Sequence, residues 1–271
     1  MAYTDSGGDG PVVLGVHGLP TSSREWRGVA AALGGDARLV VPDLPGFGGS
    51  DPADDHTLQT LAAHLDGFVA EVLGKRAVLH LAVHDIGGVI GLAWAARNLV
   101  RVASITVMNT TSFPWQFVPP PPALVGLIGG SDAAERLLTL RLFVAALKAV
   151  HVRPVPEGTA EAHWRTYEVD EAKRRALAEV FAGYRRVFGL LREVNAALPS
   201  IQVPVNIVWG AADPFCKLRS AVTYARRMPS ARLRVLADVG HFVPEEAPAE
   251  VAHEIMGAIA RAEARAALPP G

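Results

Sequence analysis

Cysteine and net charge are both nearly absent from this sequence. Cys216 is the only cysteine, so an intramolecular disulfide is excluded and a reducing compartment is favoured. No candidate base stands beside it, and we interpret its thiol as a packed side chain. The 26 Lys and Arg residues nearly balance the 27 Asp and Glu residues, which leaves no field to steer the chain towards nucleic acid or anionic membranes. We therefore expect a small molecule as its partner, and neither nucleic acid nor membrane.

Long apolar runs are missing as well. No stretch of ~18 apolar residues escapes interruption by charge, Pro or Gly, so the sequence predicts no membrane span. The first eight residues have neither the basic nor the apolar region of a signal peptide, and we expect a cytoplasmic protein. Half of the 271 residues are hydrophobic, which suffices for the core of one domain. A monomer and a homodimer both stay open.

Short β-branched runs alternate with helical patterns along most of the chain. Each run is followed by a polar or glycine-rich loop, as expected for buried strands. The predicted strands are Pro11–His17, Arg38–Val41, Ala77–Val83, Ser104–Met108, Val203–Trp209 and Arg232–Leu236, and the predicted helices include Glu25–Leu33, Leu58–Leu73, Val89–Asn98 and Pro248–Ala267. This alternation predicts an α/β fold with a mostly parallel sheet that helices cover on both faces. In such folds the loops after the strands meet at one edge, where ligands bind. These loops carry Gly18, Asp43, Asp85, Asn109, Asp213 and His241.

The alternation is interrupted between residues 110 and 199. The sequence shows no clear strand there, and a proline run, Pro119–Pro122, precedes several helical patterns. These patterns cover Ala133–Ala149, Ala160–Glu168 and Asp170–Leu198. We predict that residues 110–199 form a helical lid, or cap subdomain, and that residues 1–109 and 200–271 form the core domain.

Asp85 stands where a buried strand breaks into Gly87 and Gly88 and then a helical run. Such a strand–turn–helix corner holds the residue at its apex exposed above the sheet edge. The familiar corner, G-x-S-x-G, carries a serine, whereas this one carries a carboxylate. A carboxylate attacks through its own oxygen and needs no base for the first step. We therefore predict that Asp85 is a nucleophile and that a base is needed only for a second step.

Two later loops offer this base and its partner. Asp213 follows one predicted strand, and His241 follows the last strand with a glycine before it. The chain order Asp85, Asp213, His241 is the order of nucleophile, acid and histidine in α/β-hydrolases. We predict that His241 is the base and that Asp213 orients it. His17 and His84 are interpreted as structural, and because no histidine shows metal-ligand spacing, neither a metal nor another cofactor is predicted.

Three segments resemble the motifs of one family. His17–Arg27 resembles HGxPTSSxxWR, Asp43–Ser50 resembles DLPGFGxS, and His84–Gly88 resembles HDxGG. These motifs are typical of the aspartate-nucleophile branch of the α/β-hydrolase fold, which contains epoxide hydrolases and haloalkane dehalogenases. The resemblance covers nearly the whole chain and implies that fold, with an inserted helical lid.

The resemblance implies covalent catalysis. Asp85 would form an alkyl ester with an sp³ carbon, and His241 would activate the water that hydrolyses it. We expect the backbone N–H groups of Leu19 and Ile86 to stabilise the oxyanion of that second step. Family dehalogenases hold the halide with two side-chain N–H donors, but Leu19 and Ile86 stand at the two matched loop positions, which disfavours dehalogenation. Fluoroacetate-type dehalogenases carry arginines just after the nucleophile, where this chain has Ile86 and Val89.

Family epoxide hydrolases instead use lid tyrosines as acids for the ring oxygen. The resemblance places Tyr184 there, and we predict that it is the ring-opening acid. The second lid donor has no clear match, and Tyr167, His151, Gln116 and His163 stay open. An apolar pocket is expected. Its predicted wall residues are Phe47, Trp115, Trp164, Tyr167 and Phe242.

The sequence thus predicts a hydrolase. Our first interpretation is an epoxide hydrolase that converts an apolar epoxide into a vicinal diol. The alternative is a haloalkane dehalogenase with an atypical halide site, in which Trp115 or Trp164 supplies one donor. A non-catalytic, lid-gated binding protein is a third possibility. A complete set of nucleophile, acid and base argues against it.

Overall fold

The computed structural model describes residues 1–116, 118, 139–183 and 188–268. Within them, seven strands form one sheet in the order β1-β3-β2-β4-β5-β6-β7. β1 pairs with β3 in the antiparallel sense, and the other neighbours are parallel. The strands are β1 (Tyr3–Asp5), β2 (Val12–Val16), β3 (Arg38–Pro42), β4 (Leu79–His84), β5 (Val102–Met108), β6 (Val205–Gly210) and β7 (Ala231–Leu236). The predicted mostly parallel sheet is confirmed.

Alternate residues of the strands enter two separate cores, one on each face of the sheet. On β2, for example, Val13 packs into one core and Leu14 into the other, as the period of two in a strand requires. One core contains side chains of α1 (Arg27–Leu33), α11 (Val243–Glu246) and α12 (Pro248–Ala266). The other contains side chains of α2 (Leu58–Phe68), α3 (Ile86–Arg97) and α10 (Leu218–Arg227). Helices therefore cover both faces, as predicted.

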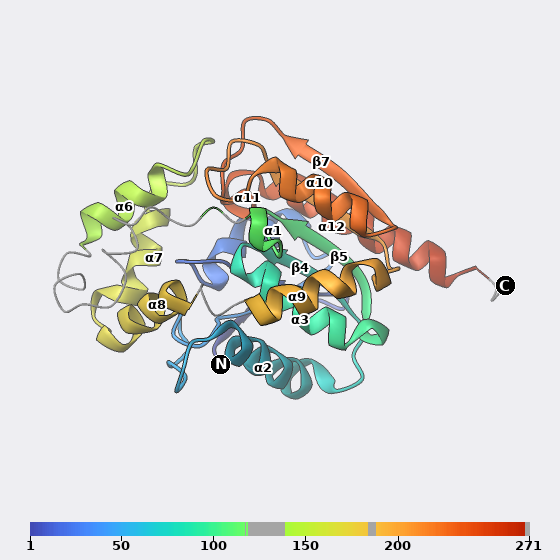
Figure 1. The fold of residues 1–271 in the computed structure, drawn as a ribbon, viewed down its shortest axis with the longest axis horizontal. Coiled ribbons are helices and arrows are strands. Elements are labelled where there is room, and N and C mark those ends of the chain that lie inside the picture. Colours follow the sequence, from blue (N-terminus) through green and yellow to red (C-terminus); the bar gives the residue numbers. More distant parts are fainter. Residues whose placement is uncertain (117, 119–138, 184–187, 269–271) are drawn as a thin grey trace.

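Four described helices lie between β5 and β6 in the chain. They are α6 (Leu140–Lys148), α7 (Thr159–Glu168), α8 (Glu171–Gly183) and α9 (Phe188–Ala197). α6, α7 and α8 group at one side of the molecule, opposite the end where α12 runs out (Figure 1). α9 packs instead along α3 of the core. The predicted proline run and Tyr184 lie outside the described residues, and the lid function of the insertion stays a prediction.

Shorter elements complete the chain: η1 (Ser23–Trp26), η2 (Val69–Gly74), η3 (Leu99–Arg101), η4 (Pro114–Gln116) and η6 (Leu198–Ser200). Of these, η2 is a π-helical turn that continues α2. A search of the described helices finds none with the length and apolarity that a membrane crossing requires.

Candidate active site

Asp85 occupies the turn between β4 and α3 with a φ of 49° and a ψ of −126°. Positive φ is uncommon for a residue with a side chain, and such strain is typical of functional corners. Glycines make this turn possible, because a Cβ on Gly87 would lie 2.4 Å from the carbonyl oxygen of Val16, and one on Gly18 would lie 2.6 Å from the Cβ of Asp85. The elbow predicted from the sequence therefore forms, with Asp85 at its apex.

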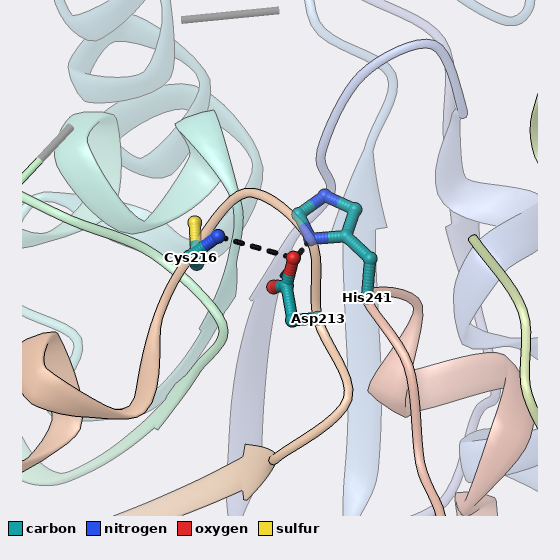
Figure 2. Close-up of side chains that lie close together, drawn as sticks. All are labelled: Asp213, Cys216 and His241. Carbon is teal, nitrogen blue, oxygen red and sulfur yellow. Dashed lines mark hydrogen bonds and ion pairs between the residues drawn. The ribbon is translucent and has the colours of Figure 1, made fainter. Parts of the chain in front are cut away.

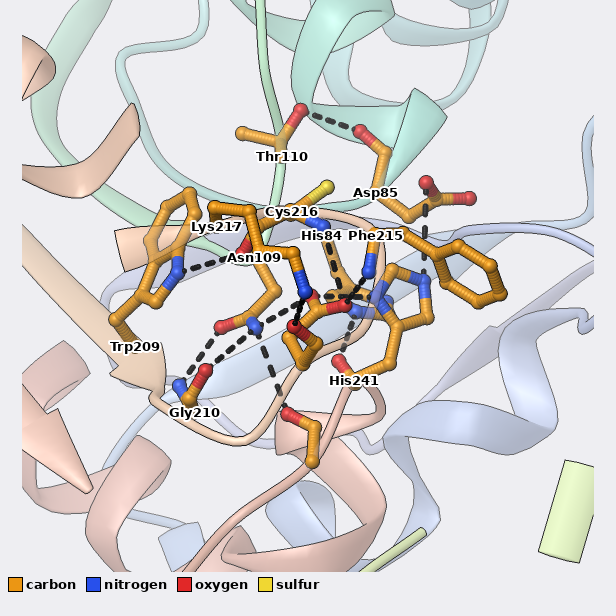
Figure 3. Close-up of polar contacts among 12 residues, drawn as sticks. His84, Asp85, Asn109, Thr110, Trp209, Gly210, Phe215, Cys216, Lys217 and His241 are labelled. Carbon is orange, nitrogen blue, oxygen red and sulfur yellow. Dashed lines mark hydrogen bonds and ion pairs between the residues drawn. The ribbon is translucent and has the colours of Figure 1, made fainter. Parts of the chain in front are cut away.

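The carboxylate of Asp85 contacts two other loops of the sheet edge. Its Oδ2 accepts the backbone N–H of Leu19 at 2.9 Å, and its Oδ1 lies 3.8 Å from Nε2 of His241. The hydroxyl of Thr110 donates to the carbonyl oxygen of Asp85 at 2.6 Å. Figure 3 shows Asp85 with Thr110 and His241. One predicted oxyanion donor, Leu19, is thus already directed at the carboxylate.

Asp213 holds the other side of the His241 ring. Its Oδ2 lies 2.8 Å from Nδ1 of His241, and its Oδ1 accepts the backbone N–H groups of Phe215 at 2.6 Å and Cys216 at 3.0 Å. Figure 2 shows the arrangement. Burial alone would raise the pKa of Asp213, but His241 and these donors lower it. Asp213 is therefore an anion, so Nδ1 of His241 carries the proton and its Nε2 faces Asp85.

The pKa of His241 results from opposing effects of burial and of neighbouring carboxylates. Burial alone would lower its pKa, yet the carboxylates of Asp213 and Asp85 raise it to about 9. At neutral pH the resting site therefore contains an imidazolium between two carboxylates.

Asn109 is a further member of the site, and the sequence prediction named only its loop. It follows β5 with a positive φ of 26°. Its Nδ2 donates to Oδ2 of Asp213 at 2.7 Å and to the carbonyl of Gly210 at 3.1 Å, and its Oδ1 accepts the N–H of Gly210 at 2.8 Å. The side chain thereby joins the end of β5 to the Asp213 loop. A polar residue directly after a predicted strand was the available signal.

His17, interpreted as structural from the sequence, has a structural role here. Its Nδ1 donates to the carbonyl of Gly18 at 2.8 Å, and its Nε2 accepts the N–H of Leu44 at 3.0 Å. Burial lowers its pKa, so the ring is neutral and ties two loops together.

Among the described residues, Asp213, Cys216 and His241 have ligand-type atoms within 4.8 Å of one another. The Asp213 oxygens already accept hydrogen bonds from His241, Asn109 and backbone N–H groups, so we interpret the group as hydrogen-bonded and not as a metal site. Burial raises the pKa of the Cys216 thiol well above its usual value, which fits the predicted packed side chain.

A cavity of about 70 Å³ opens beside Asp85. Its lining is mostly apolar: Leu58, Asp85, Ile86, Val89, Thr110, Thr111, Pro114, Phe188, Leu191 and Cys216. An apolar lining with a carboxylate at one end suits an apolar substrate that offers one electrophilic carbon.

The five predicted wall residues are not in the lining of this cavity. The side chain of Trp115 is 65% exposed, and Trp164 packs on Phe143. Phe47 packs against His17, and Phe242 packs edge-on to His241. Phe47 and Phe242 belong to the core and the other three to the insertion, and the wall role of all five stays a prediction.

The four candidates for a second ring-opening acid are engaged elsewhere. The hydroxyl of Tyr167 donates to the carbonyl of Pro20 at 2.9 Å, and Nε2 of Gln116 donates to Thr223 at 2.8 Å. His151 and His163 both bind Glu245, at 2.9 and 2.6 Å. Tyr184 lies outside the described residues, and its role stays a prediction.

The chain is similar to known proteins both in sequence and in fold. Residues 13–254 match the family described as the alpha/beta hydrolase family. A cis-3-alkyl-4-alkyloxetan-2-one decarboxylase from Xanthomonas campestris is 30% identical over 91% of this chain and 87% of its own. A haloalkane dehalogenase from Sphingobium indicum is 30% identical over 96% of this chain and 92% of its own. The crystal structure of the haloalkane dehalogenase DbeA from Bradyrhizobium elkani superposes with a TM-score of 0.82 at 23% identity, covering 97% of this chain and 94% of that one.

Proposed function

The chain belongs to the alpha/beta hydrolase family, and from this premise we propose that it hydrolyses a small apolar electrophile through an alkyl ester on Asp85. The observation that carries the proposal is the setting of the Asp85 carboxylate. One oxygen accepts the N–H of Leu19, and the other faces Nε2 of a histidine that Asp213 orients. A carboxylate in this position can act as nucleophile, with the histidine held in reserve for the second step.

The first step is a displacement at an sp³ carbon. A carboxylate oxygen of Asp85 forms a C–O bond while the bond from that carbon to the leaving oxygen of an epoxide breaks. The released alkoxide takes a proton from an acid, the role proposed for Tyr184. The product is a β-hydroxyalkyl ester of Asp85.

The second step is hydrolysis of this ester. The neutral form of His241 must remove a proton from water, although the resting pKa of the ring is about 9. Esterification removes the negative charge of Asp85, one of the charges that raise this pKa, so the ring loses its proton more readily when it is needed as a base. The hydroxide then adds to the ester carbonyl, and the intermediate collapses by breaking the bond to the alkyl oxygen. The diol leaves with the proton that His241 took from water, and Asp85 regains its carboxyl group. The N–H groups of Leu19 and Ile86 stabilise the oxyanion, and one such donor is worth roughly 3–4 kcal/mol in other hydrolases.

We favour an epoxide as the substrate because of the two residues that flank the nucleophile. Leu19 and Ile86 present apolar side chains, and a departing halide would need side-chain N–H donors in this dry cavity. An epoxide instead needs a proton donor at its ring oxygen, the role proposed for Tyr184. The second candidate is a haloalkane, which the name of the Sphingobium indicum relative favours.

Product analysis separates these reactions. The purified protein is incubated with an apolar epoxide, with a bromoalkane and with a dialkyl oxetan-2-one, and diol, bromide and carbon dioxide are measured. We expect diol from the epoxide, whereas bromide without diol would favour the second candidate. Carbon dioxide without diol would point to the reaction named for the Xanthomonas campestris relative.

Trapping of the ester tests the chemistry whatever the leaving group. His241→Gln removes the base but keeps Asp85, so the intact protein should gain the mass of the alkyl group. Asp85→Asn should neither gain this mass nor turn over substrate. A wild-type protein that turns over substrate while His241→Gln never accumulates an adduct would rule out the covalent mechanism.

A further inference from the structure

A buried ion pair lies directly beneath the nucleophile. Nδ1 of His84, the residue before Asp85, is 2.8 Å from Oε1 of Glu25, and both side chains are fully shielded from solvent. Glu25 belongs to η1, which follows the Leu19 loop, so the two partners come from separate parts of the sheet edge. Ion pairs at such depth are costly unless further hydrogen bonds satisfy both groups.

The surroundings of His84 determine its charge. Its second ring nitrogen, Nε2, lies 2.8 Å from the carbonyl oxygen of His241. The contact of Nδ1 with Glu25 is an ion pair by distance and not a hydrogen bond. Burial alone would raise the pKa of Glu25, but His84 and Thr21 lower it, so Glu25 is an anion. Both ring nitrogens therefore lie beside oxygen atoms that only accept, so both carry protons. His84 is an imidazolium. Burial alone would lower its pKa, but the Glu25 carboxylate raises it.

Each partner of the pair holds a different catalytic loop. Oε2 of Glu25 accepts the backbone N–H of Gly18 at 3.2 Å and the hydroxyl of Thr21, so it fixes the loop that presents the N–H of Leu19. His84 holds the backbone of His241 itself. One ion pair thus connects the oxyanion loop, the nucleophile elbow and the base.

We propose that Glu25 and His84 form a positioning dyad that sets His241 and the Leu19 N–H for hydrolysis of the alkyl ester. The dyad touches neither substrate nor reacting atoms. Its effect on rate rests on the proposed function, because the ester is the species whose hydrolysis it would accelerate. Attack by Asp85 needs neither the base nor the oxyanion donors, so the first step should be much less sensitive to the dyad than the second.

The dyad also affects the charge of the base. The ionisable groups that face His241 are Asp213, Asp85 and Glu25, which favour its protonated form, and the His84 cation, which opposes that form. In the alkyl ester Asp85 has lost its charge, so His84 and Glu25 then have a larger relative influence on the pKa of His241. Removing His84 should therefore raise the pKa of His241, and removing Glu25 should lower it.

The kinetic experiment compares Glu25→Gln and His84→Gln with a matched control, His80→Gln. His80 is a buried histidine on the same strand, bonded to Ser104 at 2.8 Å, and burial lowers its pKa to about 4, so it is neutral. Ester formation and ester hydrolysis are followed in single turnovers by intact-protein mass. We expect the two dyad variants to slow hydrolysis by about 100-fold and to accumulate ester, while His80→Gln keeps the wild-type partition. Equal slowing of both steps, or the same change in His80→Gln, would overturn the positioning role.

A second measurement does not depend on turnover. The pKa of the His241 ring is followed by NMR of ¹⁵N-histidine-labelled protein in the wild type and both dyad variants. We expect His84→Gln to raise it, Glu25→Gln to lower it, and the wild-type His84 ring to stay doubly protonated at the pH where His80 is neutral. If His241→Gln traps no ester but these opposite shifts appear, the proposed reaction fails and the coupling stands. Unchanged values with a trapped ester would refute the dyad alone.

Loss of a buried charge can prevent folding, so a milder variant completes the design. Thr21→Val keeps the shape of the side chain and removes two hydrogen bonds of the Leu19 loop, one to Glu25 and one to the carbonyl of Gly18 at 3.0 Å. We expect a smaller slowing of the same hydrolysis step. A Thr21→Val protein that is fully folded but slowed in ester formation alone would contradict the proposal.

Discussion

A single methyl group at position 87 would disturb the whole elbow. A Cβ there would lie 2.4 Å from the carbonyl of Val16 and 2.5 Å from that of His17, both of them backbone atoms of the neighbouring strand and loop. These atoms cannot rotate away as a side chain could. We expect Gly87→Ala to lower the free energy of unfolding by about 1–3 kcal/mol, as measured by urea denaturation, and to reduce turnover.

The matched control is another glycine inside a helix. Gly67 of α2 is exposed, and a Cβ there would meet nothing within 4 Å. Gly67→Ala should raise stability by about 0.5–1 kcal/mol because alanine restricts the unfolded chain. If both variants changed stability in the same direction, the close approach at Gly87 would not be the cause.

The charge of His241 gives stability a pH dependence. Its pKa rises from 6.5 to about 9 in the folded protein, so the folded state binds its proton more tightly than the unfolded state does. The resulting stabilisation is fully present below pH 6.5 and is lost as the pH rises through about 9. We expect the stability difference between the wild type and His241→Gln to narrow over this interval in denaturant titrations. A difference that widens with pH would contradict the assignment of the charge.

The residues of the site differ in how far sequence alone could identify them. Asp85, Asp213 and His241 could be proposed from the sequence because each follows a strand and they stand in the chain order of nucleophile, acid and histidine. The structure brings the three side chains together. Asn109 and Glu25 could not be assigned, because their roles depend on partners about a hundred and about sixty residues away. The predicted structural role of His84 is consistent with its contacts, but its partner Glu25 was not visible from spacing.

At the scale of elements, the predicted strands are confirmed with shifts of one or two residues at their ends. β1 was missed because its three exposed residues show no apolar pattern. α10 was missed because its narrow apolar face stands among three arginines. The insertion was harder to predict. Its helices were expected, but α9 packs on α3, and helix patterns do not reveal which neighbour a helix chooses.

A buried cluster attaches the inserted helices to the loop of the base. Glu245, which lies in α11 four residues after His241, binds His151 and His163 from the insertion. Burial alone would raise the pKa of Glu245, but the two histidines lower it to about 2. We expect Glu245→Gln to destabilise the protein by about 3–5 kcal/mol, since it leaves buried histidines without their anion. Hydrogen exchange of residues 139–183 should accelerate as α6 and α7 loosen.

The control for this prediction is a second contact between the insertion and the core. Glu179 of α8 binds His56 at 2.8 Å, but its side chain is 45% exposed. Glu179→Gln should cost less than about 1 kcal/mol and leave exchange of α6 and α7 unchanged. Equal effects of the two substitutions would show that the burial of Glu245 does not determine the loss of stability or the faster exchange.

At the scale of the whole molecule, the α/β-hydrolase fold expected from three motifs is confirmed by the family match and by solved structures that cover nearly the whole chain. The substrate could not be predicted to the same depth. The fold could be recognised from motifs that are local in sequence, whereas the leaving group of the proposed reaction depends on a few side chains whose direction is set by packing of the insertion.

Because the net charge of the chain is small, the exposed edge strand of the sheet should affect aggregation. At pH 7 the formal charge is −1, so repulsion between copies is weak. β7 ends the described sheet and exposes Leu233 and Val235. A charged side chain on such an edge strand discourages pairing with another copy. Arg232 is exposed on this strand. We expect Arg232→Val to aggregate faster than the wild type, as measured by light scattering. The control is Arg226→Val, which makes the same change of charge at an exposed position of helix α10 and should not aggregate faster. Equal aggregation of both variants would assign the effect to net charge and not to the strand edge.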